Sequence, residues 1–240
     1  MAKKKESFLQ RFYKQFLLIV FLVVWVWSMW NPASQENWFL ENKAVFVSMP
    51  IIYFLFVWYI KFSKLSLTLV TVFLILHVIG AHYNYGSVPI GKTLGALLAG
   101  EGTNIYDKIV HFSFGLLVVY PLREFFLRVA QLRGFWGYLV PYMAILTLAS
   151  YYEIFEWVTV MQYDTNVGYL FIGGSDPFDT TKDLFVAAVG ALITLVTVAI
   201  LEWAQSNSTF KKKMKQSFKR DTLTYPVEDT HLHEKLESIN

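Results

Sequence analysis

The stretch that decides the fold reads NIYDKIVHFSFGLLVVYPL over residues 104–122. Most of it is apolar, and its length is close to the about 20 residues that a helix needs to cross about 30 Å of hydrocarbon. Asp107 and His111 lie near its start. Ionisable side chains are costly inside a membrane, so they are functional candidates wherever they occur there. The segment therefore predicts a transmembrane helix that carries functional groups at one end.

Five further apolar runs of similar length flank this segment. Hydrophobic residues make up 55% of the 240-residue chain and charged residues only 16%, whereas a soluble domain of this size carries about a quarter charged residues. The chain has no cysteine, so the fold depends on no disulfide. We expect an all-α, polytopic membrane protein with six transmembrane helices, at about 16–30, 44–60, 65–84, 104–122, 135–156 and 183–203.

Basic residues are distributed unevenly among the predicted loops. With the N-terminus in the cytoplasm, 17 of the 21 lysine and arginine residues lie on the cytoplasmic side. The positive-inside rule therefore predicts that both termini are cytoplasmic, with segments 82–103 and 157–182 outside. We expect a basic N-terminus at 1–15, a membrane domain at 16–203 and a poorly ordered basic tail at 204–240. The expected partners are membrane lipids, with anionic lipid at the tail; no nucleic acid partner and no particular oligomeric state are predicted.

Acidic and histidine residues gather at one depth of four predicted helices. Counting about 1.5 Å per residue from the cytoplasmic boundaries places them near the outer face of the bilayer. Spacings of three or four residues put the members from each helix on a single face. A shared pocket open to the outer side is therefore expected. It comprises Asp107, His111, Glu153, Glu156, Asp179 and Asp183, with His82 at the rim and His77 at the floor.

Carboxylates brought together in this way repel one another unless protons or a cation neutralise them. Oxygen ligands with a few imidazoles suit a divalent ion such as Zn, Mg or Mn. We therefore expect such an ion as cofactor, and a purely structural hydrogen-bonded network is the alternative. The predicted ligands are His111, Asp107, Glu153, Glu156, Asp179 and Asp183, and the predicted catalytic residues are Glu153, Glu156 and Asp107.

Neighbouring residues and helices receive structural interpretations. Lys108 is expected to pair poorly with Asp107, because adjacent residues point to different faces of a helix. The first two helices are expected to pack outside the pocket as support. Arg123 and Glu124, at the other end of the fourth run, are interpreted as interfacial anchors. The segment 90–100 is apolar but too short to span, so it lies at the interface or re-enters the membrane.

Five ordered motifs resemble the YjdF-like family of bacterial inner-membrane proteins, whose function is unknown. The motifs are HYNYGSVP at 82–89, NIYDKIVHF at 104–112, RE at 123–124, YEIFEW at 152–157 and GSDPFDTTKD at 174–183. The chain has Leu184 where the family usually has methionine. A fainter similarity to VanZ-like membrane proteins lies in the Asp-Lys-x-x-His-Phe motif. The resemblance implies six spans in the bacterial plasma (inner) membrane.

Three functions are compatible with these patterns. The first is a metal-dependent hydrolase or transferase that acts on a lipid or lipid-linked substrate from the extracytoplasmic side. The second is a non-enzymatic membrane assembly or stress factor with a structural polar core. The third is a cation- or proton-coupled transporter, which is disfavoured because the inner halves of the helices are apolar and no inverted repeat is apparent.

Overall fold

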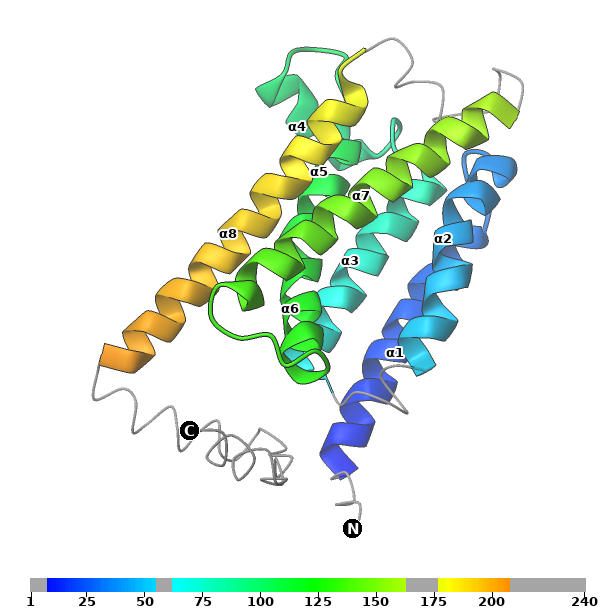
Figure 1. Cartoon of the computed structure of the whole chain (residues 1–240). Helices are drawn as coiled ribbons and strands as arrows, with labels where there is room; N and C mark the ends of the chain where they lie inside the picture. The colour runs from blue at the N-terminus through cyan, green and yellow to red at the C-terminus, as the bar shows by residue number, and fades with distance from the viewer. Residues whose placement is uncertain (1–7, 55–61, 163–176, 208–240) are drawn as a thin grey trace, which may run out of the picture. The chain divides into compact units, whose positions relative to one another are not determined.

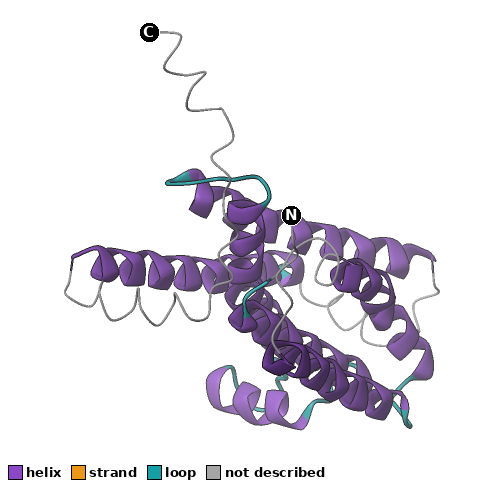
Figure 2. Ribbon diagram, turned by 90° about the horizontal axis from the view of Figure 1, so that it is seen from below, coloured by secondary structure: helices purple, strands orange, loops and turns teal. Residues whose placement is uncertain are grey.

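The computed structural model describes residues 8–54, 62–162 and 177–207 (Figures 1 and 2). Every regular element in these residues is helical, which confirms the predicted all-α class. Residues 1–7 of the predicted basic N-terminus and most of the predicted tail lie outside the described residues, and residues 8–15 form the first turns of α1. The elements are α1 (Phe8–Met29), α2 (Gln35–Phe54), α3 (Lys64–His82), α4 (Pro89–Leu98), α5 (Tyr106–Ser113), the π-helix η2 (Phe114–Val118), α6 (Val119–Arg128), α7 (Trp136–Gln162) and α8 (Asp179–Asn207).

Four helical stretches in the described residues are long and apolar enough to cross a membrane. They are Phe12–Met29, Lys64–His82, Tyr106–Arg128 and Asp179–Ser206. The third is formed by α5, η2 and α6 in succession. The other two predicted spans fall in α2 and α7, which are helical but carry several polar residues, and the second predicted run continues past the described part of α2.

Local hydrogen bonds explain where two helices begin. Ser63 is the N-cap of α3, and its Oγ accepts a hydrogen bond from the backbone of Ser66. At α2, the Oγ of Ser34 accepts from the backbone of Asn37 at 3.2 Å. This helix therefore starts well before the apolar run expected from residue 44. Hydropathy does not detect the added turns, because they are polar.

The chain divides into two compact units, Met1–Thr197 and Val198–Asn240, and the described part of the second is the end of α8. In the first unit, α1 and α2 pack on α3 through a cluster formed by Phe21, Val45, Leu74 and Val78. Close backbone contact brings α8 against η2. A Cβ on Gly115 would lie 1.9 Å from the carbonyl oxygen of Ala187, so only glycine fits there.

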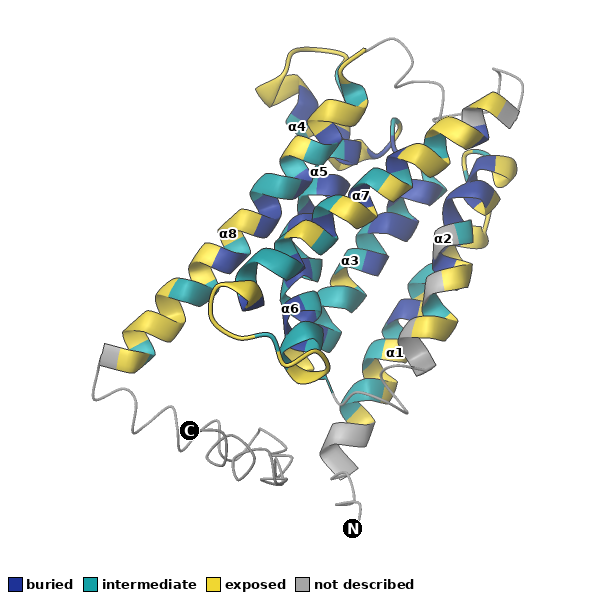
Figure 3. Cartoon of the chain, viewed as in Figure 1, coloured by how far each residue is buried: buried dark blue, intermediate teal, exposed yellow. Residues whose placement is uncertain are grey.

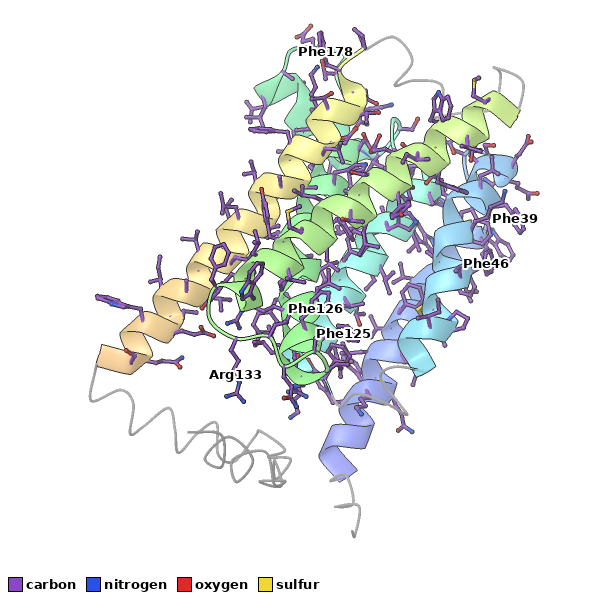
Figure 4. All side chains as sticks on the ribbon, viewed as in Figure 1. Phe39, Phe46, Phe125, Phe126, Arg133 and Phe178 are labelled. Atoms are coloured by element: carbon purple, nitrogen blue, oxygen red, sulfur yellow. The ribbon has the colours of Figure 1, made fainter. Side chains whose placement is uncertain are left out.

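Two polar regions lie at opposite ends of the helices of the first unit. One, called the Lys108 end, contains α4 and the first turns of α5 and α8; the other, called the Glu124 end, contains Ser63 and the last turns of α6 (Figure 1). Figure 4 shows Phe178 at the first end and Arg133 at the second. Buried residues alternate with exposed ones along the helices between them (Figure 3). A buried apolar cluster lies between the two regions and consists of Val119, Ile145, Ala191 and Leu195.

Candidate functional site

Lys108 lies among three carboxylates at the N-terminal ends of α5 and α8. Its Nζ is 3.0 Å from Oδ2 of Asp107, 2.5 Å from Oδ1 of Asp179 and 2.7 Å from Oδ2 of Asp183. The side chains of Lys108 and Asp179 are 24% and 30% exposed, whereas that of Asp183 is 2% exposed. The polar region therefore extends from an accessible edge at Asp179 to a buried carboxylate at Asp183.

The prediction that Lys108 pairs poorly with Asp107 is wrong. The two side chains leave α5 in different directions, but the four-carbon stem of lysine is flexible. It places the ammonium group within hydrogen-bonding distance of both Asp107 and the acids on α8. Residue spacing on one helix also did not predict the contacts with Asp179 and Asp183, because these two partners belong to α8.

His111 connects α5 to α7. Its Nε2 lies 3.6 Å from Oδ1 of Asp107, one turn earlier in α5, and 3.6 Å from Oε1 of Glu153 in α7. All three residues are buried. We call the whole set the acid–lysine cluster: Asp107, Lys108, His111, Glu153, Asp179 and Asp183.

The acid–lysine cluster contains more acidic groups than basic ones. Two of its carboxylate oxygens, Oδ1 of Asp183 and Oε1 of Glu153, are buried and have no hydrogen-bond partner among the described residues. A buried carboxylate oxygen without a partner loses its hydration and gains nothing in return. The acid–lysine cluster can therefore bind an additional proton or cation through these oxygens.

Three of the predicted ligands have the spacing that a metal ion requires. One ligand atom each from Asp107, His111 and Asp183 lies within 4.8 Å of the other two. Lys108 contacts the Oδ2 atoms of both aspartates, so each aspartate retains its Oδ1 for another partner. Asp179 is engaged with Lys108, and Glu156 lies one turn beyond Glu153 in α7, partly buried.

A second polar network joins α2, α3 and α7 through Glu41. The phenol of Tyr152 donates to Oε2 of Glu41 at 2.6 Å. His77 Nε2 donates to the backbone oxygen of Glu41 at 3.2 Å, so its Nδ1 accepts from Tyr85 at 2.7 Å. Burial raises the pKa of the Tyr85 phenol well above its usual range, which keeps it a donor.

Glu41 corrects the expectation that the first two helices only support the site from outside. It is 4% exposed, and its Oε1 has no hydrogen-bond partner among the described residues. The rings of His111 and Tyr152 lie 6.0 Å apart, so the Glu41 network adjoins the acid–lysine cluster. Sequence reasoning missed Glu41 because it precedes the apolar run, although an acid within a helical extension of that run would have been a signal.

The structure places the two predicted peripheral histidines differently. His77, expected at the floor, belongs to the Glu41 network. His82, expected at the rim, contacts α1 instead: its Nδ1 lies 3.0 Å from the backbone oxygen of Ser28, and its ring centroid is 4.5 Å from that of Trp27. The described contacts of His82 thus tie α3 to α1.

A buried carboxylate also occupies the Glu124 end. Glu124 accepts hydrogen bonds from the backbone nitrogen and the Oγ of Ser63, both at 2.8 Å, and from the Oγ of Ser66, and it pairs with Arg128. We call this arrangement the Glu124 cap, because it closes the N-terminus of α3. Arg123 and Glu124 are each 8% exposed, so the interpretation as interfacial anchors is wrong. The Arg123 guanidinium lies 4.5 Å from the ring centroid of Tyr138.

Comparison with known proteins places these residues in a family. A curated relative is "Inner membrane protein YjdF" of Escherichia coli (strain K12), which is 32% identical over 139 residues. The aligned part covers 57% of this chain and 66% of the relative, slightly less than two thirds of its length. No solved structure matches the chain. The family described as "Predicted membrane protein (DUF2238)" matches residues 13–204, so the chain belongs to that family and is a multi-pass inner-membrane protein.

Proposed function

We propose that the protein is a membrane enzyme, a hydrolase or transferase, that acts on a lipid or lipid-linked substrate at a divalent-cation centre. The observation that carries the proposal is the convergence of Asp107, His111 and Asp183, whose ligand atoms lie within 4.8 Å of one another. Oδ1 of Asp183, which is buried and has no hydrogen-bond partner in the described part of the chain, supports it further. Catalytic metal sites have three protein ligands and keep an open position for water or substrate, and imidazole and carboxylate are ligands that suit divalent ions.

The surrounding residues have roles that fit this chemistry. A divalent ion at this position would polarise a phosphoryl or acyl oxygen and lower the pKa of a bound water. Oε1 of Glu153 lies 3.6 Å from Nε2 of His111 and has no hydrogen-bond partner among the described residues, so Glu153 is our candidate general base. Lys108 holds the Oδ2 atoms of Asp107 and Asp183 and thereby orients their second oxygens. The exposed edge at Asp179 gives the substrate access.

The apolar layer favours a one-sided catalyst over a transporter. Val119, Ile145 and Ala191 have no exposed surface, and they lie between the acid–lysine cluster and the Glu124 cap on three different helices. A transported ion would have to cross this apolar layer, which is costly. An enzyme that takes its substrate from one leaflet needs no such path.

The proposed topology has six spans, with both termini in the cytoplasm and the Lys108 end outside. It rests on the concentration of basic residues, 17 of 21, on the side that carries the Glu124 end. The membrane domain is then 16–203, flanked by the basic N-terminus and tail. The tail's lysines would contact anionic lipid of the cytoplasmic leaflet.

A structural role is the second candidate, and one observation favours it. Lys108 already links α5 to α8 through Asp179 and Asp183, and Tyr152 links α7 to α2 through Glu41. Such bridges would hold the helices in register without any ion. In this case the polar residues would serve membrane assembly rather than catalysis.

Metal binding by purified protein separates the two candidates. The protein is equilibrated with Mn²⁺ or Zn²⁺ in detergent, dialysed and analysed for metal content, together with Asp183→Asn and with Glu101→Gln, an exposed acid at the same end. We expect bound ion in the wild type and in Glu101→Gln, and its loss in Asp183→Asn. Equal metal content in all three proteins would refute the centre.

Catalysis is tested with the same variants in vesicles of phosphatidylethanolamine and phosphatidylglycerol. Lipid products are followed by mass spectrometry with added Mn²⁺ or with chelator. The enzyme proposal expects a product that requires both the ion and Asp183. Bound metal with unchanged lipids would reject these substrates and leave the metal centre in place.

A further inference from the structure

The short helix α4 has three distinct faces. At about 100° per residue, Gly91 and Gly95 share one face. Lys92 and Ala96 fall on the second, and Thr93 lies between the second face and the third. The third, nearly opposite Lys92, contains Ile90, Leu94, Leu97 and Leu98.

The glycine face packs on the chain just before α5. A Cβ on Gly91 would lie 2.1 Å from Oδ1 of Asn104, and a Cβ on Gly95 would lie 2.1 Å from the backbone oxygen of Thr103. The backbone nitrogen of Ile105 also donates to the carbonyl of Gly91 at 3.2 Å. These contacts fix α4 beside the start of the candidate span Tyr106–Arg128 (Figure 1).

The apolar face is uncovered in the described structure. Ile90 is 58% exposed, Leu97 79% and Leu98 71%. The ten residues of α4 give a helix of about 15 Å, which is too short to cross a membrane. Lys92, on the opposite side, is exposed as well. A helix with apolar and polar sides, fixed at the end of a span, has the pattern of helices that lie in a membrane interface.

We propose that α4 lies in the plane of the membrane surface at the Lys108 end and binds the acyl chains of that leaflet through Ile90, Leu97 and Leu98. The glycine face then rests against the helices of the protein, and Lys92 faces the headgroups and water. Because α4 packs on the residues that lead directly into Asp107, the bound acyl chains lie beside the acid–lysine cluster. This inference does not depend on a metal or on catalysis.

Single cysteines test the orientation of α4, because the native chain has none. Leu97→Cys and Lys92→Cys are labelled with an environment-sensitive nitrobenzoxadiazole dye, and each protein is reconstituted in phosphatidylcholine vesicles. We expect the dye at 97 to emit at shorter wavelength, to resist quenching by iodide and to be quenched by lipids with a nitroxide on the acyl chain. The dye at 92, on the opposite side of the helix, should behave in the opposite way.

Two other outcomes would overturn the proposal. Equal iodide quenching at both positions would place α4 in water. Protection of position 97 from both iodide and lipid nitroxide would show that protein, such as a second copy of the chain, covers the face.

A Gly95→Leu change in the Leu97→Cys protein tests whether the glycine face positions α4. The change should displace α4 and at least halve the protection from iodide. Unchanged protection would show that the glycine face does not position the helix.

Discussion

The acid–lysine cluster and the Glu124 cap are both buried and both contain a carboxylate beside a basic residue, but they differ in balance. Glu124 receives hydrogen bonds from Ser63, from Ser66 and from Arg128, and none of its oxygens is without a partner. Asp183 and Glu153 each keep a buried oxygen that no described residue satisfies. Both carboxylate oxygens of the Glu124 cap are therefore hydrogen-bonded, whereas the acid–lysine cluster has oxygens that could still bind a proton or a cation.

This difference separates structure from function more clearly than burial does. A satisfied buried carboxylate stabilises the elements that it joins, as Glu124 does by capping α3 and joining it to α6. A buried carboxylate without hydrogen-bond partners lowers the stability of the fold. Such a group is therefore expected where function, rather than folding, requires it. Substitutions in the two regions should therefore differ in their effect on stability and in their response to divalent ions.

Replacing Lys108 with methionine should cause the greatest loss of stability. The change removes the ammonium group from Asp107, Asp179 and Asp183 and leaves their charges facing one another. Breaking a buried charge arrangement in this way costs about 3–5 kcal/mol. We expect a marked fall in the thermal midpoint of the purified protein at neutral pH.

The pH dependence of this loss distinguishes charge repulsion from lost packing. Lower pH protonates the carboxylates and removes their repulsion, so the deficit of Lys108→Met should shrink as the pH falls and grow as it rises. Lys108→Arg keeps the charge and should lose less. A deficit that is the same at every pH would contradict the charge explanation.

Removing one carboxylate from the acid–lysine cluster should change the response to metal. Without divalent ion, Asp183→Asn relieves repulsion while losing a contact with Lys108, so its stability should stay close to that of the wild type. With Mn²⁺ at about 100 times the dissociation constant, the wild type should gain about 2.7 kcal/mol and the variant nothing. Thermal melts with Mn²⁺ and with chelator measure both. Equal gains in the two proteins would remove Asp183 from the ligand set.

A substitution in the Glu124 cap should lower stability without divalent ion and should not change the response to Mn²⁺. Glu124→Gln weakens the charged hydrogen bonds to Ser63 and Ser66 and the pair with Arg128, at a cost of about 1.5–3 kcal/mol. No divalent ion should restore this loss, because the cap has no unused ligand. Restoration by Mn²⁺ in thermal melts would show that both ends of the protein bind ions and would remove the contrast between them.

The sequence predicted the class of fold and the convergence of several polar residues, because helix periodicity determines which residues share a face. Asp107 and His111 are four residues apart and face the same neighbours in the structure. Depth counting predicted that Glu153 and Asp183, on two other helices, would lie at their level, and the structure brings them to the same cluster.

The remainder depended on contacts between helices. Lys108 reaches across to α8, and Glu41 enters from a helix whose start was set by a serine hydrogen bond rather than by hydropathy. The π-helix η2 was also not predicted; it lies where Gly115 meets the backbone of α8, a feature of packing rather than of local propensity. The catalytic and metal-binding roles assigned to the site stay predictions.

Which of the two ends faces the cytoplasm can be tested with substitutions that should leave stability nearly unchanged. Glu101, at the Lys108 end, and Arg133, at the Glu124 end, are both exposed, and cysteine at either position would be the only thiol in the chain. If the positive-inside rule holds, a membrane-impermeant maleimide should label Glu101→Cys in intact cells and Arg133→Cys only after permeabilisation. The reverse pattern would place the acid–lysine cluster on the cytoplasmic side. The proposed substrate would then come from the cytoplasmic leaflet, although the geometry of the cluster and its unused oxygens would be the same.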